Sequence, residues 1–184
     1  PMVKTAELVG NASETGLISV EGNIEMPNPL IAPCSGRPCV YYEIIVTQQH
    51  EEQVRTENGI KKKRGKRTVK HEKVGGQFYI NDGSGPAKVD ASEAQVNGSM
   101  EKSFKQDGPA SGYLTFGQYQ INVPPHGGNG YAIGTSVTEK IIPAEGSAYV
   151  AGRLEGDTIM RKKNMGGKLL IAKEGAEALQ KATK

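Results

Sequence analysis

The sequence contains little material for a large apolar core or for cysteine-based chemistry. Of its 184 residues, 36% are hydrophobic, tryptophan is absent, phenylalanine occurs three times and cysteine twice. Two cysteines are too few for a disulfide scaffold, and no apolar run approaches the roughly 18 residues that a membrane-spanning helix requires. Residues 1–15 also lack the apolar stretch of a signal peptide. We therefore expect no fold held together by disulfides. Pro1 ahead of Met2 indicates that the sequence is a segment of a longer protein.

Glycine and proline, by contrast, are frequent, with 24 and 10 residues. Such a composition suits many short strands joined by tight turns. Residues 39–49 form the clearest strand pattern, because Val40, Tyr42, Ile44 and Val46 recur at every second position. Further strands are expected at 3–9, 17–25, 78–81, 87–90, 113–123, 147–154, 158–163 and 168–172.

The segments between these strands are expected to be loops or short helices. Residues 99–112 read as a polar loop, 135–142 as a short helix or turn, and about 174–183 as a short C-terminal helix. Because exposed sheet edges must be protected, many short strands favour a barrel or a sandwich over an open sheet. The sequence therefore predicts a mainly β fold, a barrel-like or OB-like arrangement of short antiparallel strands with one helix at its end.

Positive charge is concentrated in one stretch of the chain. The whole chain has a net charge of +3, but residues 61–73 carry +7, since eight Lys or Arg accompany the single acid Glu72 and the rest carries −4. The eight cations are Lys61, Lys62, Lys63, Arg64, Lys66, Arg67, Lys70 and Lys73. We expect residues of about 50–74 to form a long hairpin that projects into solvent, with its tip at 58–59 or at 63–66.

This basic hairpin is the strongest candidate for a binding feature, and three interpretations of it are open. It could contact anionic lipid headgroups or nucleic-acid phosphates, although the run has no aromatic side chain on which bases could stack. It could also be a solvated tip, partly neutralised by Glu51 and Glu52 across the strands.

No group of residues indicates catalysis or a metal. Cys34, Cys39, His50 and His71 offer donor atoms, but no pair of histidines has ligand spacing, and His126 lies in a glycine-rich loop. We therefore expect no metal site and no cofactor. Burial beside apolar neighbours should raise the pKa of Cys39 and prevent it from acting as a nucleophile.

Two further local patterns have simple structural explanations. The glycine-rich segment 82–85 is followed by a strand pattern, so a hairpin turn explains it better than a phosphate cradle, which needs a helix behind the glycines. A disulfide between Cys34 and Cys39 could form in an oxidising compartment, although Pro38 stiffens the loop between them. A Ser-His-Asp triad assembles in space and leaves no necessary pattern, but the nucleophile elbow that often marks one is missing.

Three segments occur in an order that carries a resemblance. They are residues 33–43, PCSGRPCVYYE; residues 76–90, GQFYINDGSGPAKVD; and residues 139–154, EKIIPAEGSAYVAGRL. Together they resemble the membrane-proximal domain of the mitochondrial-anchored E3 ubiquitin ligases, which is called the GIDE or "beside a membrane" domain. The basic stretch between Glu57 and Val74 is not explained by this resemblance.

The resemblance implies one soluble domain over 1–184 in a protein anchored by transmembrane segments outside this sequence. In that family the domain lies between two transmembrane helices, across the membrane from the ligase RING. A RING needs eight Cys or His ligands, whereas this chain has two Cys and three His, so no ligase chemistry is expected in it. The implied role is a sensor, scaffold or substrate-binding module. A protein partner is then the first expectation, an anionic membrane surface the second and nucleic acid the third, with no small-molecule substrate.

Overall fold

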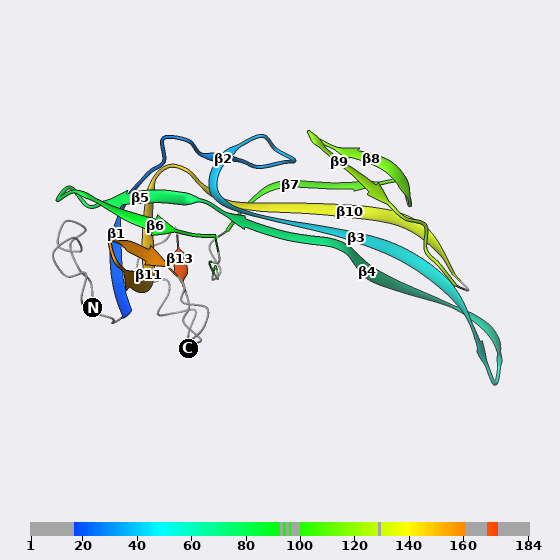
Figure 1. Cartoon of the computed structure of the whole chain (residues 1–184). Helices are drawn as coiled ribbons and strands as arrows, with labels where there is room; N and C mark the ends of the chain where they lie inside the picture. Colours follow the sequence, from blue (N-terminus) through cyan, green and yellow to red (C-terminus); the bar gives the residue numbers. More distant parts are fainter. Residues whose placement is uncertain are drawn as a thin grey trace.

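The computed structural model describes residues 17–92, 94, 96, 100–128, 130–160 and 169–172, and every regular element in these ranges is a β-strand. The mainly β prediction is therefore confirmed. The described ranges contain no helix long and apolar enough to cross a bilayer. The strands form a barrel at one end of the molecule and a long sheet that extends away from it (Figure 1).

Five strands close the barrel, and a sixth pairs with one of them. Around the ring the strands are β1 (Leu17–Glu25), β5 (Gln77–Asn81), β6 (Pro86–Asp90), β12 (Thr158–Met160) and β11 (Ser147–Glu155). The β1–β11 pairing closes the ring, and β13 (Leu170–Ala172) pairs with β11 beside β12. All pairs are antiparallel except β6–β12. This closed five-stranded ring confirms the expected barrel-like arrangement.

Alternation along each strand builds the barrel core. In β5, for example, Phe78 and Ile80 are fully buried, whereas Tyr79 between them is 38% exposed. Val20, Val89, Val150 and Ile159 fill the same core cluster from other strands. The turn 82–85 joins β5 to β6 as a hairpin, with positive φ at Gly83 and Gly85, as the sequence predicts.

The second sheet is here called the arm sheet, or the arm. Its strands lie between barrel strands in the sequence. It contains β2 (Leu30–Ile31), β3 (Pro38–Thr56), β4 (Gly59–Gly75), β10 (Gly130–Pro143) and β7 (Glu101–Gly108). The β3–β4 hairpin turns at 57–58, and the 19 residues of β3 correspond to about 60 Å of extended chain. The projecting basic hairpin is therefore present, and it turns at the first of the two predicted tips.

A small hairpin, β8 (Gly112–Phe116) and β9 (Tyr119–Val123), covers one face of the arm sheet (Figure 1). Leu114, Phe116 and Val123 pack there against Val46 and Val137. We call this face the closed face. At the base of the other face, Tyr41 and Ile142 belong to the barrel core, so the barrel lies on that side. We call this side of the arm sheet, where it extends beyond the barrel, the open face.

Several local predictions were wrong. Residues 135–142 lie in β10, because Thr135, Val137 and Glu139 are buried at every second position, which is the period of a strand. The polar loop expected at 99–112 contains β7, an edge strand whose exposed sides accept charged residues. Residues 113–123 form a hairpin rather than one strand, with Gly117 at φ +62° in its turn. The strand at 3–9, the end of the strand 158–163 and the helix at about 174–183 lie outside the described residues.

Candidate functional site

Two of the three segments that carry the resemblance, 33–43 and 139–154, meet at one buried carboxylate, Glu139. Its Oε2 accepts a hydrogen bond from the backbone N–H of Cys34 at 2.6 Å, and its Oε1 accepts bonds from the Ser35 N–H at 3.2 Å and the Ser35 hydroxyl at 2.6 Å. The Ser103 hydroxyl donates to the same oxygen at 2.7 Å. Burial alone would raise the pKa of Glu139, but these hydrogen bonds hold it below its ordinary value. The motif therefore fastens a loop to the arm sheet.

The two thiols beside this carboxylate are buried and free. Burial, with the nearby charge of Glu139, raises the pKa of Cys34 to about 12 and that of Cys39 to about 11. At neutral pH both are therefore thiols rather than thiolates, which confirms the expectation for Cys39. These buried thiols are therefore poor candidates for nucleophilic chemistry.

All eight predicted cations lie on β4, but they divide between the two faces of the arm sheet. Residues directly opposite each other on paired strands share a face. Lys62, Arg64, Lys66 and Lys73 lie opposite Gln53, Glu51, Gln49 and Glu43 on the open face. Lys61, Lys63, Arg67 and Lys70 lie opposite Val54, Glu52, Gln48 and Val46 on the closed face. The single cluster suggested by the sequence is thus two rows on opposite faces.

Neighbouring strands add further cations to the open face. The pairing of β10 with β3 and β7 places Lys140, Lys102 and Lys105 on this face, nearer the barrel. In the paired strands, three acids lie on the same face as these cations, and they are Glu43, Glu51 and Asp107. Glu51 is the only one of the three that is buried; Lys62 Nζ and Arg64 Nε lie 3.6 and 3.5 Å from its oxygens. The β7 and β10 lysines were not predicted, because they follow no run in the sequence.

Apolar and aromatic side chains accompany the cations near the outer end of the open face. Tyr131 lies opposite Glu51 and is 52% exposed, and Ile60 near the hairpin tip is 66% exposed. A groove of about 260 Å³ is lined by Gln49, Arg64, Gly65, Lys66 and Ile133. The aromatic side chain that the basic run lacks is therefore supplied by β10.

Two of the four closed-face cations, Arg67 and Lys70, have structural partners on that face. Arg67 donates from Nε to Gln48 Oε1 at 2.7 Å and from Nη2 to the Pro125 carbonyl at 3.3 Å. Lys70 Nζ lies 5.6 Å from the centre of the Tyr119 ring. In addition, β4 pairs only with β3 in the described sheets, and lysines on an edge strand discourage edge-to-edge aggregation. The charge of β4 alone therefore does not identify a ligand.

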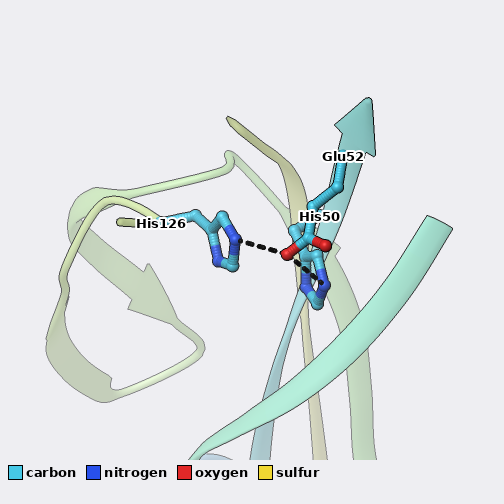
Figure 2. Close-up of side chains that lie close together, drawn as sticks. All are labelled: His50, Glu52 and His126. Carbon is cyan, nitrogen blue, oxygen red and sulfur yellow. Dashed lines mark hydrogen bonds and ion pairs between the residues drawn. The ribbon is translucent and has the colours of Figure 1, made fainter. Parts of the chain in front are cut away.

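A second group of polar side chains lies on the closed face, and it brings together two histidines that have no ligand spacing in the sequence. His50, Glu52 and His126 have potential metal-ligating atoms within 4.8 Å of one another (Figure 2). The two imidazole rings are stacked, with centroids 4.3 Å apart and planes at 5°. His126 is 74 residues from Glu52 in the sequence, so only the His-x-Glu spacing on β3 could have given a signal.

Comparison with models of protein families gives a match. A model of the protein family described as GIDE, E3 ubiquitin ligase, matches residues 47–184. The match includes the outer part of β3, the other arm strands except β2, the histidine group and the barrel strands except β1. No curated protein and no solved structure matches the chain.

Proposed function

The chain belongs to the GIDE, E3 ubiquitin ligase, family, and from this premise we propose that it is a non-catalytic, membrane-proximal interaction module of a membrane-anchored protein. Two observations support the non-catalytic part. The chain's two cysteines and three histidines are fewer than the eight ligands of a RING, and both thiols have raised pKa values. On this proposal the ligase function of the family depends on partners or segments that the domain positions.

The open face of the arm sheet is the surface that we assign to binding. The observation that carries this assignment is the row of Lys62, Arg64 and Lys66 beside the exposed Tyr131 and Ile60. Cations attract anionic headgroups, and aromatic or apolar side chains insert at the boundary between headgroups and acyl chains. A protein partner with an acidic surface would be recognised by the same charges.

Sedimentation with anionic liposomes tests this assignment. Each Lys or Arg near an anionic membrane contributes about 1 kcal/mol, so the open-face variant K62Q/R64Q/K66Q should bind roughly 100-fold more weakly. The closed-face variant K61Q/K63Q/K70Q removes the same charge and should retain clearly more of the binding. Equal losses would mean that net charge alone matters, and unchanged binding by the open-face variant would exclude the lipid part of the proposal.

Nucleic-acid binding is the second candidate, favoured by Tyr131 lying beside the cationic row and by the OB-like ring. It predicts oligonucleotide affinity that falls steeply with salt, because bound phosphates release counterions. A Tyr131→Ala variant should then weaken single-stranded oligonucleotide binding at constant charge. Binding that is absent at low salt, or indifferent to Tyr131, would decide against it.

Recruitment of a protein partner requires a separate experiment. We expect crosslinking in the native membranes, after nuclease treatment, to recover a specific protein with the wild-type chain. The open-face variant should recover less of it if the cations contribute to that contact. Recovery of the same protein in the same amount would place the partner's site elsewhere, for example on the barrel.

A further inference from the structure

Three side chains converge on the closed face where the arm leaves the cover of the β8–β9 hairpin. His50 and Glu52 are two residues apart on β3 and therefore project from the same face. His126 comes from the loop after β9 and meets them from the opposite side (Figure 2). Glu52 Oε1 lies 3.2 Å from His126 Nε2 and 3.7 Å from His50 Nε2.

These separations resemble those of ligands around one ion. Zinc bonds to nitrogen and oxygen are about 2.0–2.2 Å long, and tetrahedral geometry then places neighbouring ligand atoms roughly 3.3–3.5 Å apart. Two imidazoles and one carboxylate are also a donor set that divalent zinc-class ions prefer over calcium or magnesium. We propose that His50, Glu52 and His126 bind one divalent transition-metal ion of this class, with a coordination position left for water or an exogenous ligand.

The backbone around the three residues is arranged to hold them. The fully buried Gln48 donates from Nε2 to the carbonyls of Ala110 and Pro124 at 2.9 and 2.8 Å, and Arg67 reaches the Pro125 carbonyl. These bonds anchor the residues directly before His126. A loop ligand is thereby presented to a rigid strand, as a metal site requires.

Two glycines provide the space for the side chains. Gly65 lies opposite His50 and interrupts the basic run; a Cβ there would lie 2.7 Å from His50 Nε2. Gly130 lies opposite Glu52, and a Cβ there would lie 2.7 Å from Glu52 Cγ and 3.0 Å from His126 Cδ2. Glycine inside a strand is unfavourable unless another group must approach closely, and here the approaching groups are the three proposed ligands.

The ring nitrogens that face away from Glu52 also lack partners among the described residues. The Nδ1 atoms of His50 and His126 are buried and have no hydrogen-bond partner in the described part of the chain. Such orphaned atoms are uncommon and are often explained by a ligand. Because the rings are parallel, the lone pairs of the two Nε2 atoms do not converge, so binding of one ion requires one ring to rotate.

The consequence of an ion here would be a cross-link between β3 and the loop that contains His126. Glu52 is the most accessible of the three, with 42% of its side chain exposed, against 15% for His50 and 11% for His126. An ion would therefore enter from the Glu52 side. Lys63 lies across the strands from Glu52 and would oppose the charge of the ion, so the site should favour ions held by strong nitrogen bonds.

Titration of the full chain with Zn²⁺ by calorimetry and with Co²⁺ by visible absorption, after treatment with a chelator, tests the proposal. We expect one ion per chain and d–d bands of Co²⁺ bound to nitrogen. His126→Ala and His50→Ala should each weaken binding by about 100-fold or more, since each removes a direct ligand. His71→Ala is the matched control, because it removes the third histidine of the chain, which is exposed beside Glu43.

A variant outside the ligands separates metal binding from folding. Gly65→Ala leaves all donor atoms in place but crowds His50, so it should weaken metal binding while the circular dichroism spectrum of the chain without metal stays unchanged. Absence of a one-to-one complex in the wild type would overturn the proposal. So would wild-type affinity in His126→Ala and His50→Ala, or loss of binding in His71→Ala.

Discussion

The barrel and the outer part of the arm both contain antiparallel hairpins, but different forces hold them. In the barrel each strand buries one row of side chains in a shared core, and Val20, Phe78 and Val150 are completely inaccessible. Beyond Glu52 the paired strands of the arm are exposed on both faces, with Val54 and Ile60 accessible to solvent. A two-stranded ribbon without a core is only marginally stable by itself, so the arm depends on the sheet from which it extends.

The largest expected difference between the two regions concerns truncation of apolar side chains. Phe78→Ala should cost about 3–5 kcal/mol of unfolding free energy, because it leaves a cavity in the closed ring. Ile60→Ala near the arm tip should change it by at most about 0.5 kcal/mol. Urea unfolding of both variants measures the contrast. A cost above about 1 kcal/mol for Ile60 would show that the tip is covered in solution.

The Glu139 network, which ties the loop after β2 to the arm sheet, should have an intermediate effect. Glu139→Gln replaces an acceptor-only carboxylate with an amide whose N–H groups oppose the donors from Cys34, Ser35 and Ser103, so we expect a loss of about 2 kcal/mol. The pKa of Glu139 is lowered in the fold. Its contribution is therefore complete above the ordinary carboxyl value and is lost as the pH falls through the folded pKa.

Unfolding measured across the acid range checks this linkage. The difference between wild type and Glu139→Gln should be constant near neutral pH and should shrink under acidic conditions, where the wild-type carboxylate takes up a proton. A difference that stays the same down to strongly acidic pH would contradict the lowered pKa. Ser136→Ala is a suitable control, because its hydroxyl bonds to the exposed Asp107 instead.

The smallest expected effect concerns local opening rather than global stability. Backbone amides of residues 53–62 should exchange with deuterium faster than those of β5 and β6, although both sets are paired in hairpins. Exposed hydrogen bonds without a packed core open at low free-energy cost. Mass-spectrometric exchange at several times measures this. Equal protection of the two sets would show that the arm is as stable as the barrel.

The same contrast determines what could be predicted from the sequence. Barrel strands such as 78–81 and 147–154 were located correctly, since burial on one face imposes a period of two. Residues 135–142 were mistaken for a helix or turn because the buried positions of β10 include Thr135 and Glu139, whose polarity hides the period. The edge strand β7 has almost no apolar signal, for it is exposed along most of its length.

The candidate sites could be predicted only where their residues lie close together in the sequence. The cations of β4 were found because they are consecutive, but their division between two faces depends on the pairing with β3. The lysines of β7 and β10 join the open face only through the register of three strands. The meeting of His126 with His50 depends on the fold of the intervening residues, including the β8–β9 hairpin, and no local pattern encodes it.

The connection between arm and barrel has a mechanical consequence. Only Gly76 separates β4 from β5, and the Gly76 N–H bonds to the Val40 carbonyl at 2.9 Å while its own carbonyl accepts from Ala91. A side chain at Gly75 would overlap the Ala91 carbonyl, so the backbones there are in close contact. The arm therefore has no free joint at its base. A displacement of the sheet next to this connection would therefore act as torque on the barrel wall instead of being taken up by a flexible linker.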